Sequence, residues 1–484
     1  MFVLNNLKPQ PLFGYFEQIC QVPRPSKKEE KIRQYLLQFA AKNDLETKTD
    51  KIGNVLIFKT CTPGYENAPT VVLQTHMDMV CEKNSDKIFD FDNDSIEPVV
   101  SDGWVKANGT TLGADCGIGI AAQLAVLTSN KIKHGPLECL ITVDEETGLT
   151  GAFGLKPDFL SGSVLLNLDS EDEGEIFIGC AGGIDTIATF SFKTEQVPEK
   201  SRAFKISVSG LLGGHSGDDI HKNRGNANKI LNRFLWKLVQ SYDIKLADFN
   251  GGNLRNAIAR EAFAIITVSS IHQESVVSDF NLFSTDLKTE FEKNEPGLQL
   301  NIEKNNVPGF VIDKKSMLNL LNSLNACPHG VLAMSSRMEG MVETSTNLAS
   351  VKFVGNNKIK VTTSQRSEIK SRKTMAAEMV ESVFKLAGAG VEHSDGYPGW
   401  TPNPDSEVLK ITVDSYKKLF GVEPVVRSIH AGLECGLFLE KYPGLDMVSF
   451  GPTIRGAHSP DERLDIESTG KFWKHLVEVL ENLR

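Results

Sequence analysis

Five side chains in this 484-residue chain are of the types that bind metal ions in hydrolases. Each ends a short apolar run or lies in a glycine-rich turn beside one, and they are His76, Asp115, Glu146, Asp169 and His458. Two nitrogens and three carboxylates suit a pair of divalent metals better than one, because a carboxylate has two oxygens and can bridge two ions. The set therefore predicts a hydrolytic metal centre.

Two further acids, Asp78 and Glu145, lie close in sequence to ligand candidates and could assist the metal centre. In LQTHMDMV, His76 and Asp78 are two residues apart on a predicted strand and so share a face. One nitrogen of His76 can then bind a metal while the other donates to Asp78, which fixes the tautomer. In LITVDEETG, Glu146 can bind a metal and Glu145 can take the proton of a metal-bound water.

Each motif taken alone has a simpler reading. The histidine–aspartate pair could be a surface hydrogen bond, and Asp115, between Gly113 and Gly117, could cap a helix. The three acids of DEETG could form an exposed turn, although crowding them without a cation would be costly. The five together favour the metal centre.

Short apolar runs alternate with helical patterns in the first third of the chain, at 55–58, 71–73, 137–143 and 164–168. This order predicts an α/β fold in which a mostly parallel sheet has helices on both faces. All five ligand candidates then fall at or just past the carboxyl ends of strands, where open α/β sheets bind ligands. Ser26 and Glu29 have the spacing of a capping box before a helix.

The pattern changes at 185–397, which we expect to be an inserted α+β lid domain. Alternating strands followed by an amphipathic helix occur there twice, which leaves open two α+β halves. Residues 1–184 and 398–484 would form one catalytic metal-binding domain, and the chain would return to it to supply His458.

Composition limits the classes of binding partner and the cellular compartment that we expect for this chain. A net charge of −10 argues against nucleic acid or an anionic membrane. We see no signal-peptide pattern, and no apolar run of about 18 residues would span a membrane. Eight scattered cysteines without a CxxC pair fit reduced thiols in the cytoplasm. Cys81 and Cys116 lie near the motifs, but thiolates would be unusual at a hydrolytic carboxylate site.

Over its whole length the chain resembles the dinuclear zinc exopeptidases, a family that includes carboxypeptidase G2, aminoacylase-1 and bacterial dipeptidases. The similar stretches, in the family's order, are HMD, GADCG, DEETG, NLD and AHSPDE, with GGHSGDDIHKNRGNAN in the insert. Longer stretches, such as VETSTNLASV and SIHAGLECG, are similar to one dipeptidase of that family.

The resemblance implies a role for each ligand candidate. Asp115 would bridge two zinc ions. His76 and Asp169 would complete one site, and Glu146 and His458 would complete the other. Co²⁺ and Mn²⁺ are also compatible with oxygen and nitrogen ligands.

The resemblance also implies the catalytic and substrate-binding residues. Asp78 would orient a ligand, Glu145 would be the general base, and His215 would stabilise the oxyanion. Asn256 would help to hold the substrate, and Arg366 would receive its free carboxylate, for which a bidentate arginine is suited.

The roles of three further residues are open. His221 competes with His215, which matches the family motif better. Gly432 and Glu434 stand where many relatives have a GGTD-like turn and would be substrate-binding, but this chain has AGLE, so the role of Glu434 is open.

The expected activity is hydrolysis of dipeptides with a free C-terminal carboxylate, including those that end in histidine, by a hydroxide shared between the metals. An N-acyl amino-acid deacylase or an aminotripeptidase of the same family is the alternative. A non-catalytic metal-binding protein is the alternative from another class. The oligomeric state stays open between a monomer and a homodimer.

Overall fold

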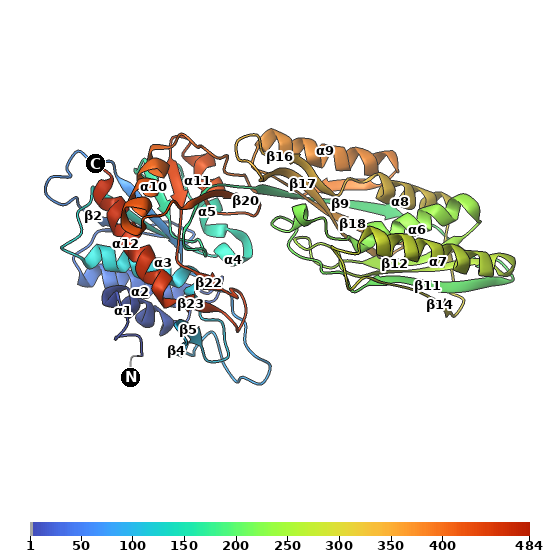
Figure 1. Ribbon diagram of the computed structural model, residues 1–484, viewed down its shortest axis with the longest axis horizontal. Coiled ribbons are helices and arrows are strands. Elements are labelled where there is room, and N and C mark those ends of the chain that lie inside the picture. The colour runs from blue at the N-terminus through green and yellow to red at the C-terminus, as the bar shows by residue number, and fades with distance from the viewer. Residues whose placement is uncertain (1–2) are drawn as a thin grey trace. The chain divides into compact units, whose positions relative to one another are not determined.

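The chain folds into two compact units, as seen in the computed structural model, which describes residues 3–484 (Figure 1). The first unit runs to Gly179 and also contains Trp400–Ser428 and Leu433–Arg484. The second unit contains Cys180–Gly399 and a short return, Ile429–Gly432. The sequence pattern did not indicate this return, because only four residues make it.

An eight-stranded sheet forms the centre of the first unit. In spatial order its strands are β1 (Thr47–Thr49), β2 (Val55–Lys59), β6 (Leu137–Thr142), β3 (Val71–His76), β7 (Val164–Asn167), β21 (Asp446–Ser449), β8 (Glu175–Cys180) and β20 (Val425–Ile429). The central strands β6, β3, β7 and β21 are parallel, and the pairs β1–β2, β2–β6 and β21–β8 are antiparallel. The predicted α/β class is confirmed, with antiparallel strands toward the edges.

Helices pack around this sheet and explain why its central strands are buried. They are α1 (Gln10–Cys20), α2 (Glu30–Lys42), α3 (Ala114–Thr128), α4 (Glu145–Gly148), α5 (Thr150–Gly154), α10 (Glu407–Phe420), α11 (Cys435–Lys441) and α12 (Ile466–Asn482). Nearly every residue of α3 is buried, as its apolar sequence predicts. A small sheet joins β22 (Ile454–Arg455), β23 (Arg463–Asp465), β5 (Trp104–Ala107) and β4 (Pro98–Ser101).

The second unit contains a nine-stranded sheet. Its main order is β14 (Gln299–Asn305), β11 (Ser201–Ser209), β13 (Ala262–Ser269), β12 (Lys245–Gly251), β17 (Val342–Val354), β18 (Lys358–Ser367), β9 (Gly182–Ser191) and β19 (Gly390–His393), and β16 (Gly330–Met334) pairs with β17. Strands β10 (Thr194–Glu195) and β15 (Val311–Ile312) pair separately. The turn between β17 and β18 is the hairpin that GNNK predicts, with Asn356 and Asn357 at positive φ.

Two halves of this sheet have the same topology. The strands β11, β12, β13 and β14 are connected through α6 (Ala227–Ser241) and α7 (Gln273–Glu290). The strands β9, β17, β18 and β19 are connected through α8 (Lys314–Ala326) and α9 (Lys370–Leu386). In both halves the fourth strand lies beside the first and the third beside the second, and β12 pairs with β17 where the halves meet.

One apolar core serves both halves of the second unit. It takes Leu231 and Phe234 from α6, Phe280 from α7, Leu320 from α8 and Phe384 from α9. The four helices lie along the sheet in Figure 1. No helix within residues 3–484 is long and apolar enough to cross a membrane.

A buried histidine links the stability of the first unit to pH. His475 on α12 is 3% exposed and contacts the carbonyl oxygen of Thr412 through Nε2 at 2.8 Å. Burial lowers its pKa to about 4, against the weaker raising effects of that hydrogen bond and of Glu478. The unfolded chain therefore binds a proton at this position between about pH 6.5 and pH 4, and the folded chain does not.

We expect stability to fall as the pH drops from 7 to 4.5, and we expect His475→Gln to remove about 2–3 kcal/mol of that fall. Glutamine keeps a donor for Thr412 but does not titrate. Urea midpoints at both pH values, for both proteins, measure the difference. An identical pH dependence in the variant would contradict the assignment.

Candidate metal centre

Three of the five ligand candidates follow central parallel strands. His76 is the last residue of β3, Glu146 lies in α4 just after β6, and Asp169 lies two residues past β7. Because these strands are parallel, their carboxyl ends meet at one edge of the sheet. Three separate segments of the chain therefore bring ligand atoms to one place.

Asp115 and His458 arrive by other routes. Asp115 lies in the first turn of α3, with φ −78° and ψ 116°, and no strand ends there. The expectation that all five residues follow strand ends of the α/β sheet is therefore wrong for Asp115, which a glycine-rich helix start positions instead. It is also wrong for His458, which follows β22 of the small sheet. His458 lies in the loop between β22 and β23, at φ 62°.

Asp115 faces both histidines. Its Oδ1 lies 3.0 Å from Nε2 of His76, and its Oδ2 lies 3.2 Å from Nε2 of His458. His76 Nε2 also lies 3.3 Å from Asp169 Oδ1, and His458 Nε2 lies 3.1 Å from Glu146 Oε2. One carboxylate is thus shared by two clusters, each with one imidazole and one further acid.

The electrostatics of these clusters fit divalent cations. Burial alone would lower the pKa of His76, but the neighbouring carboxylates outweigh it and raise that pKa. Hydrogen bonds to Asp115 and Glu146 raise the pKa of His458 to about 11, and burial raises that of Asp169 to about 6. Glu146 Oε1 is buried with no hydrogen-bond partner among the described residues. Such crowded acids are stabilised by a cation.

Asp78 organises the segment after β6 as well as His76. Its Oδ1 lies 3.2 Å from Nδ1 of His76 and accepts a hydrogen bond from the Glu145 backbone at 3.0 Å. Its Oδ2 accepts from the Ser26 hydroxyl at 2.8 Å and from the Glu146 backbone at 3.3 Å. Burial alone would raise the pKa of Asp78, but the hydrogen bonds and His76 lower it to about 2. Asp78 therefore stays charged and fixes the imidazole.

The predicted capping box at the start of α2 is wrong. No side chain caps this helix, because Ser26 donates to Asp78 instead. Glu29 accepts from the backbone N–H groups of Lys27 and Asp144. The two residues with capping-box spacing therefore brace the loops of the metal centre.

Two other groupings fit a metal less well. Cys116 lies within ligand distance of His76 and Asp169, but burial raises the pKa of its thiol well above the usual value, so it stays protonated. The acids Glu29, Asp78 and Asp144 also lie together. Their oxygens accept hydrogen bonds from Ser26, Thr147, Thr150 and backbone N–H groups, which leaves little room for a cation.

Arg24 and Glu462 hold the segment that carries Asp115. The buried carboxylate of Glu462 accepts hydrogen bonds from four consecutive backbone N–H groups, those of residues 112–115, at 2.7 to 3.4 Å. The buried guanidinium of Arg24 donates to the carbonyls of Gly113, Met77 and Asp78. A side chain at Gly113 would collide with Arg24 Nη2, which explains the glycine there.

Sequence reasoning missed both residues. Arg24 has no motif around it, and Glu462 could have been found only as the acid that ends AHSPDE. Glu462 also shares its loop with His458, so one short segment supplies a ligand candidate and the group that fixes Asp115.

The expected groups of the insert lie in the second unit. Arg366 on β18 donates to the Tyr397 hydroxyl at 2.9 Å and to the Ser216 hydroxyl at 3.4 Å. Its Nη2 lies 3.5 Å from Nε2 of His215. Asn256 is exposed, and its carbonyl accepts from the Ser216 backbone at 2.8 Å.

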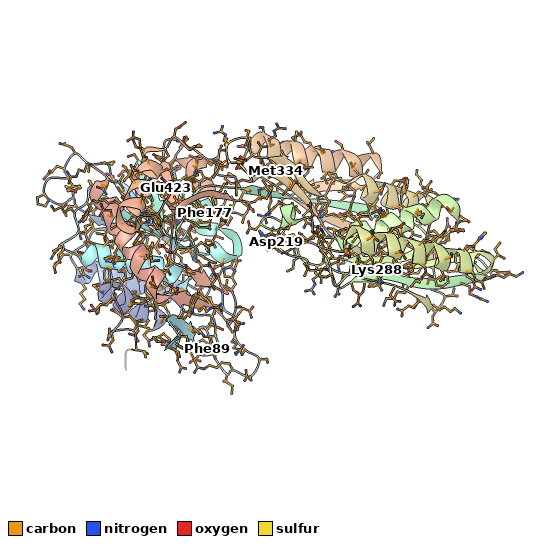
Figure 2. The ribbon with its side chains drawn as sticks, viewed as in Figure 1. Phe89, Phe177, Asp219, Lys288, Met334 and Glu423 are labelled. Atoms are coloured by element: carbon orange, nitrogen blue, oxygen red, sulfur yellow. The ribbon has the colours of Figure 1, made fainter. Side chains whose placement is uncertain are left out.

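Asp219, labelled in Figure 2, fixes the loop of His215 by accepting a hydrogen bond from its backbone at 2.8 Å. It also pairs with Lys222 and Arg224. His221 is exposed on a short helix, η1 (Ile220–Lys222), whereas His215 lies beside Arg366. This arrangement favours His215 over His221.

Gly432 and Glu434 fall in different units. A Cβ atom at Gly432 would lie 2.8 Å from the ring of Tyr397, so the glycine makes room for that ring. Glu434 is 1% exposed and accepts hydrogen bonds from Gln74 at 2.6 Å and Thr142 at 2.8 Å. Burial raises its pKa to about 8. Glu434 thus ties together the ends of β3 and β6.

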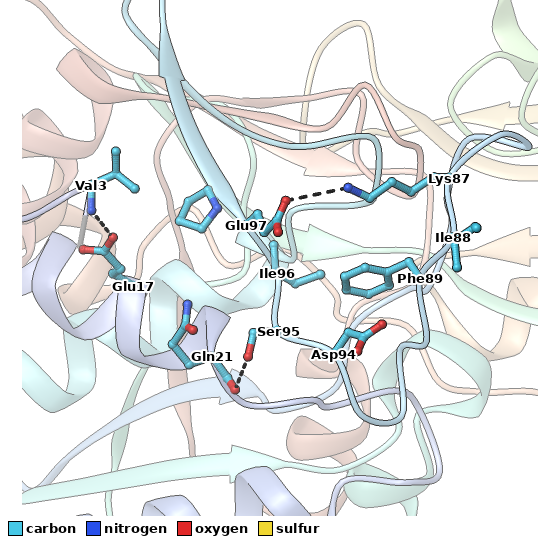
Figure 3. A pocket seen from close by; sticks show the side chains of 11 residues that line it. Val3, Glu17, Gln21, Lys87, Ile88, Phe89, Asp94, Ser95, Ile96 and Glu97 are labelled. Carbon is cyan, nitrogen blue, oxygen red and sulfur yellow. Dashed lines mark hydrogen bonds and ion pairs between the residues drawn. The ribbon is translucent and has the colours of Figure 1, made fainter. Parts of the chain in front are cut away.

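A separate cavity of about 620 Å³ lies in the first unit (Figure 3). None of its lining residues is a ligand candidate. Lys87 and Glu97 lie 3.7 Å apart there, and Glu17 accepts hydrogen bonds from the backbone of Val3 and Leu4. Asp94 accepts a hydrogen bond from the Asp90 backbone at 2.8 Å, so the charged groups of the cavity are paired with each other or with backbone N–H groups.

Comparisons with known proteins identify the family of the chain. The model of Peptidase family M20/M25/M40 matches residues 72–482. A cytosol non-specific dipeptidase from Escherichia coli is 46% identical over 483 residues, which cover 100% of this chain and 99% of the relative. An aminoacylhistidine dipeptidase from Vibrio alginolyticus, known from its crystal structure, is 46% identical in sequence and superimposes with a TM-score of 0.92. The match covers 99% of this chain and 98% of the Vibrio chain. A tripeptidase from Staphylococcus aureus, at 18% identity and a TM-score of 0.58 over 99% of both chains, shares the fold.

We expect Glu462→Gln to weaken metal binding by about 10- to 100-fold, because an amide NH₂ would face backbone donors and Asp115 would shift. Metal retained per chain after dialysis against a chelator, by elemental analysis, measures this effect. Glu17→Gln is the matched control, since Glu17 is equally buried and also accepts from consecutive backbone N–H groups. Equal metal retention in the two variants would contradict the role of Glu462.

Proposed function

Because the chain belongs to Peptidase family M20/M25/M40, we propose that it is a metal-dependent dipeptidase that hydrolyses dipeptides with a free C-terminal carboxylate. The observation that carries this proposal is the double contact of Asp115 with His76 and His458, which a bridging ligand requires. The full-length identity of 46% to the cytosol non-specific dipeptidase, peptidase D, supports the substrate class. It also confirms the resemblance of the whole chain to that dipeptidase.

We assign two divalent cations to the five ligand candidates. His76 and Asp169 would hold one, Glu146 and His458 the other, and Asp115 would touch both. The oxygen and nitrogen donors suit Zn²⁺ first, and Co²⁺ or Mn²⁺ as alternatives. Such cations, when bound, polarise a carbonyl and lower the pKa of water.

Glu145 is the proposed general base. It stands next to a ligand candidate, and its backbone N–H is held by Asp78, so its position is fixed. Burial and the neighbouring acids raise the pKa of its carboxyl, which favours accepting a proton. Glu145 would take a proton from the attacking water and deliver it to the leaving amine.

The second unit supplies the proposed substrate groups. Arg366 would bind the terminal carboxylate through its guanidinium. His215 would donate to the oxyanion, a contact whose loss typically costs about 10²–10³ in rate. Asn256 would help to hold the substrate. The name of the Escherichia coli relative supports a cytosolic location, which is also what the cysteines indicate.

A substrate panel tests the proposed reaction. We expect dipeptides, including those that end in histidine, to be cleaved by the zinc-loaded enzyme and not after chelation, with activity returning when zinc is restored. Release of free amino acids measures cleavage. Preference for N-acetyl amino acids would show a deacylase instead, and preference for tripeptides would show an aminotripeptidase.

Replacing the base separates chemistry from metal binding. We expect Glu145→Gln to lower kcat by at least about 10³-fold while the metal content stays unchanged, because the amide cannot take a proton. Steady-state kinetics and elemental analysis of the same preparation measure both quantities. Ordinary turnover in this variant would remove Glu145 from the mechanism.

A further inference from the structure

We infer that Tyr397 is a specificity-determining residue, whose phenolic hydroxyl donates a hydrogen bond to the terminal carboxylate of the substrate beside Arg366. The inference rests on the proposed function, because the carboxylate is that of a dipeptide. It is carried by the donors of Arg366 and Tyr397 in the second unit, which no carboxylate of the described residues accepts from, with the His215 donor beside them.

Arg366 is the first of these donors. It is 6% exposed, and its nearest partners are the neutral hydroxyls of Tyr397 and Ser216. Within the described part of the chain, no carboxylate forms an ion pair with it. A buried charge without a counter-ion is costly, so this guanidinium calls for an anion from outside the chain.

His215 is the second donor. Its Nδ1 accepts hydrogen bonds from the backbone N–H groups of Gly217 at 3.3 Å and Asp218 at 3.2 Å, and the Asp218 carboxylate lies 3.6 Å away. Burial and Arg366 lower the pKa of His215, which favours its neutral form. Because Nδ1 accepts from the backbone, that form carries its proton on Nε2. That N–H lies 3.5 Å from Nη2 of Arg366, and two donors cannot satisfy each other.

Tyr397 is the third donor. Its hydroxyl oxygen accepts from Arg366, so its own hydrogen must point elsewhere, and no described residue accepts it. Burial raises the pKa of Tyr397, so the phenol keeps its proton. The substrate carboxylate would be the missing acceptor.

The ring of Tyr397 is held in place before any ligand arrives. Its backbone exchanges hydrogen bonds with Gly183, at 2.9 and 3.1 Å, and Lys373 donates to its carbonyl. A Cβ atom at Gly183 would lie 2.7 Å from the ring, and one at Gly432 would lie 2.8 Å from it. Both glycines therefore leave the space that the ring occupies, and little ordering is needed on binding.

This arrangement selects substrates whose C-terminus is a free carboxylate. A carboxylate has two oxygens that accept hydrogen bonds, so it can satisfy Arg366 and Tyr397 together. A C-terminal amide presents an NH₂ group in place of one oxygen and carries no charge. Sites built to hydrogen-bond one group discriminate strongly against analogues that leave their donors unpaired.

The test compares a dipeptide with its C-terminal amide. In Tyr397→Phe we expect KM for the dipeptide to rise about 10-fold with kcat within about twofold, because one hydrogen bond to a charged group is lost. The preference in kcat/KM for the acid over the amide should fall by a similar factor. A fall in kcat at unchanged KM would place the hydroxyl on the oxyanion and overturn the inference, as would an unchanged acid-to-amide preference.

Two further variants keep the result interpretable. Tyr242→Phe is the matched control in the same unit, since its hydroxyl donates to Asp279 at 2.8 Å and the change should leave the preference intact. Gly432→Ala should reproduce the loss by displacing the ring. Melting temperatures of all variants identify any that are poorly folded.

A binding measurement separates this inference from the proposed function. Calorimetric titration of the dipeptide and its amide into metal-loaded Glu145→Gln protein, with and without Tyr397→Phe, needs no turnover. An acid preference about 10-fold smaller in the double variant supports Tyr397 even if the dipeptide is not the natural substrate. An equal preference in both proteins refutes it, whatever the activity of the wild type.

Discussion

Crowding of negative charge at the ends of parallel strands is the constraint on which the first unit depends. His76, Glu146 and Asp169 reach one edge of the sheet because β3, β6 and β7 run in the same direction. Carboxylates at this density are stable only with compensating positive charge or hydrogen-bond donors. The local structure supplies donors to some of these acids. The Ser26 hydroxyl donates to Asp78, and four backbone N–H groups donate to Glu462. The ligand candidates that lack such donors are the ones left for cations.

The second unit has the opposite imbalance. Arg366 is buried among neutral partners, and the imidazole of His215 adds a second donor rather than an acceptor. Under the proposed function, the acids of the first unit would hold the cations and supply the base. The donors of the second unit would bind the terminal carboxylate of the substrate.

Much of this could be predicted from the sequence, because the ligand types are local and lie beside periodic apolar runs. The runs before His76, Glu146 and Asp169 are visible without any structure, and so is the hairpin at GNNK. Asp115 was placed wrongly, because a helix start and a strand end look alike in a glycine-rich turn. The capping box failed because Asp78, remote in sequence, competes for Ser26. Arg24 could not be found, since its role comes from backbone carbonyls remote in sequence. Tyr397 could not be found either, since its inferred role depends on a side-chain contact with Arg366 across the fold.

The distance along the chain between Asp169 and His458 has a consequence for biosynthesis. During translation, the first four ligand candidates leave the ribosome before the second unit is made, whereas His458 and Glu462 follow it. Until then the loop of Asp115 has Arg24 but lacks Glu462 and one of its two imidazoles. A nascent chain can therefore pair β2, β6, β3 and β7 early, but β21 and the metal centre must wait for the last segment. Competence for hydrolysis is postponed until that segment has joined the first unit.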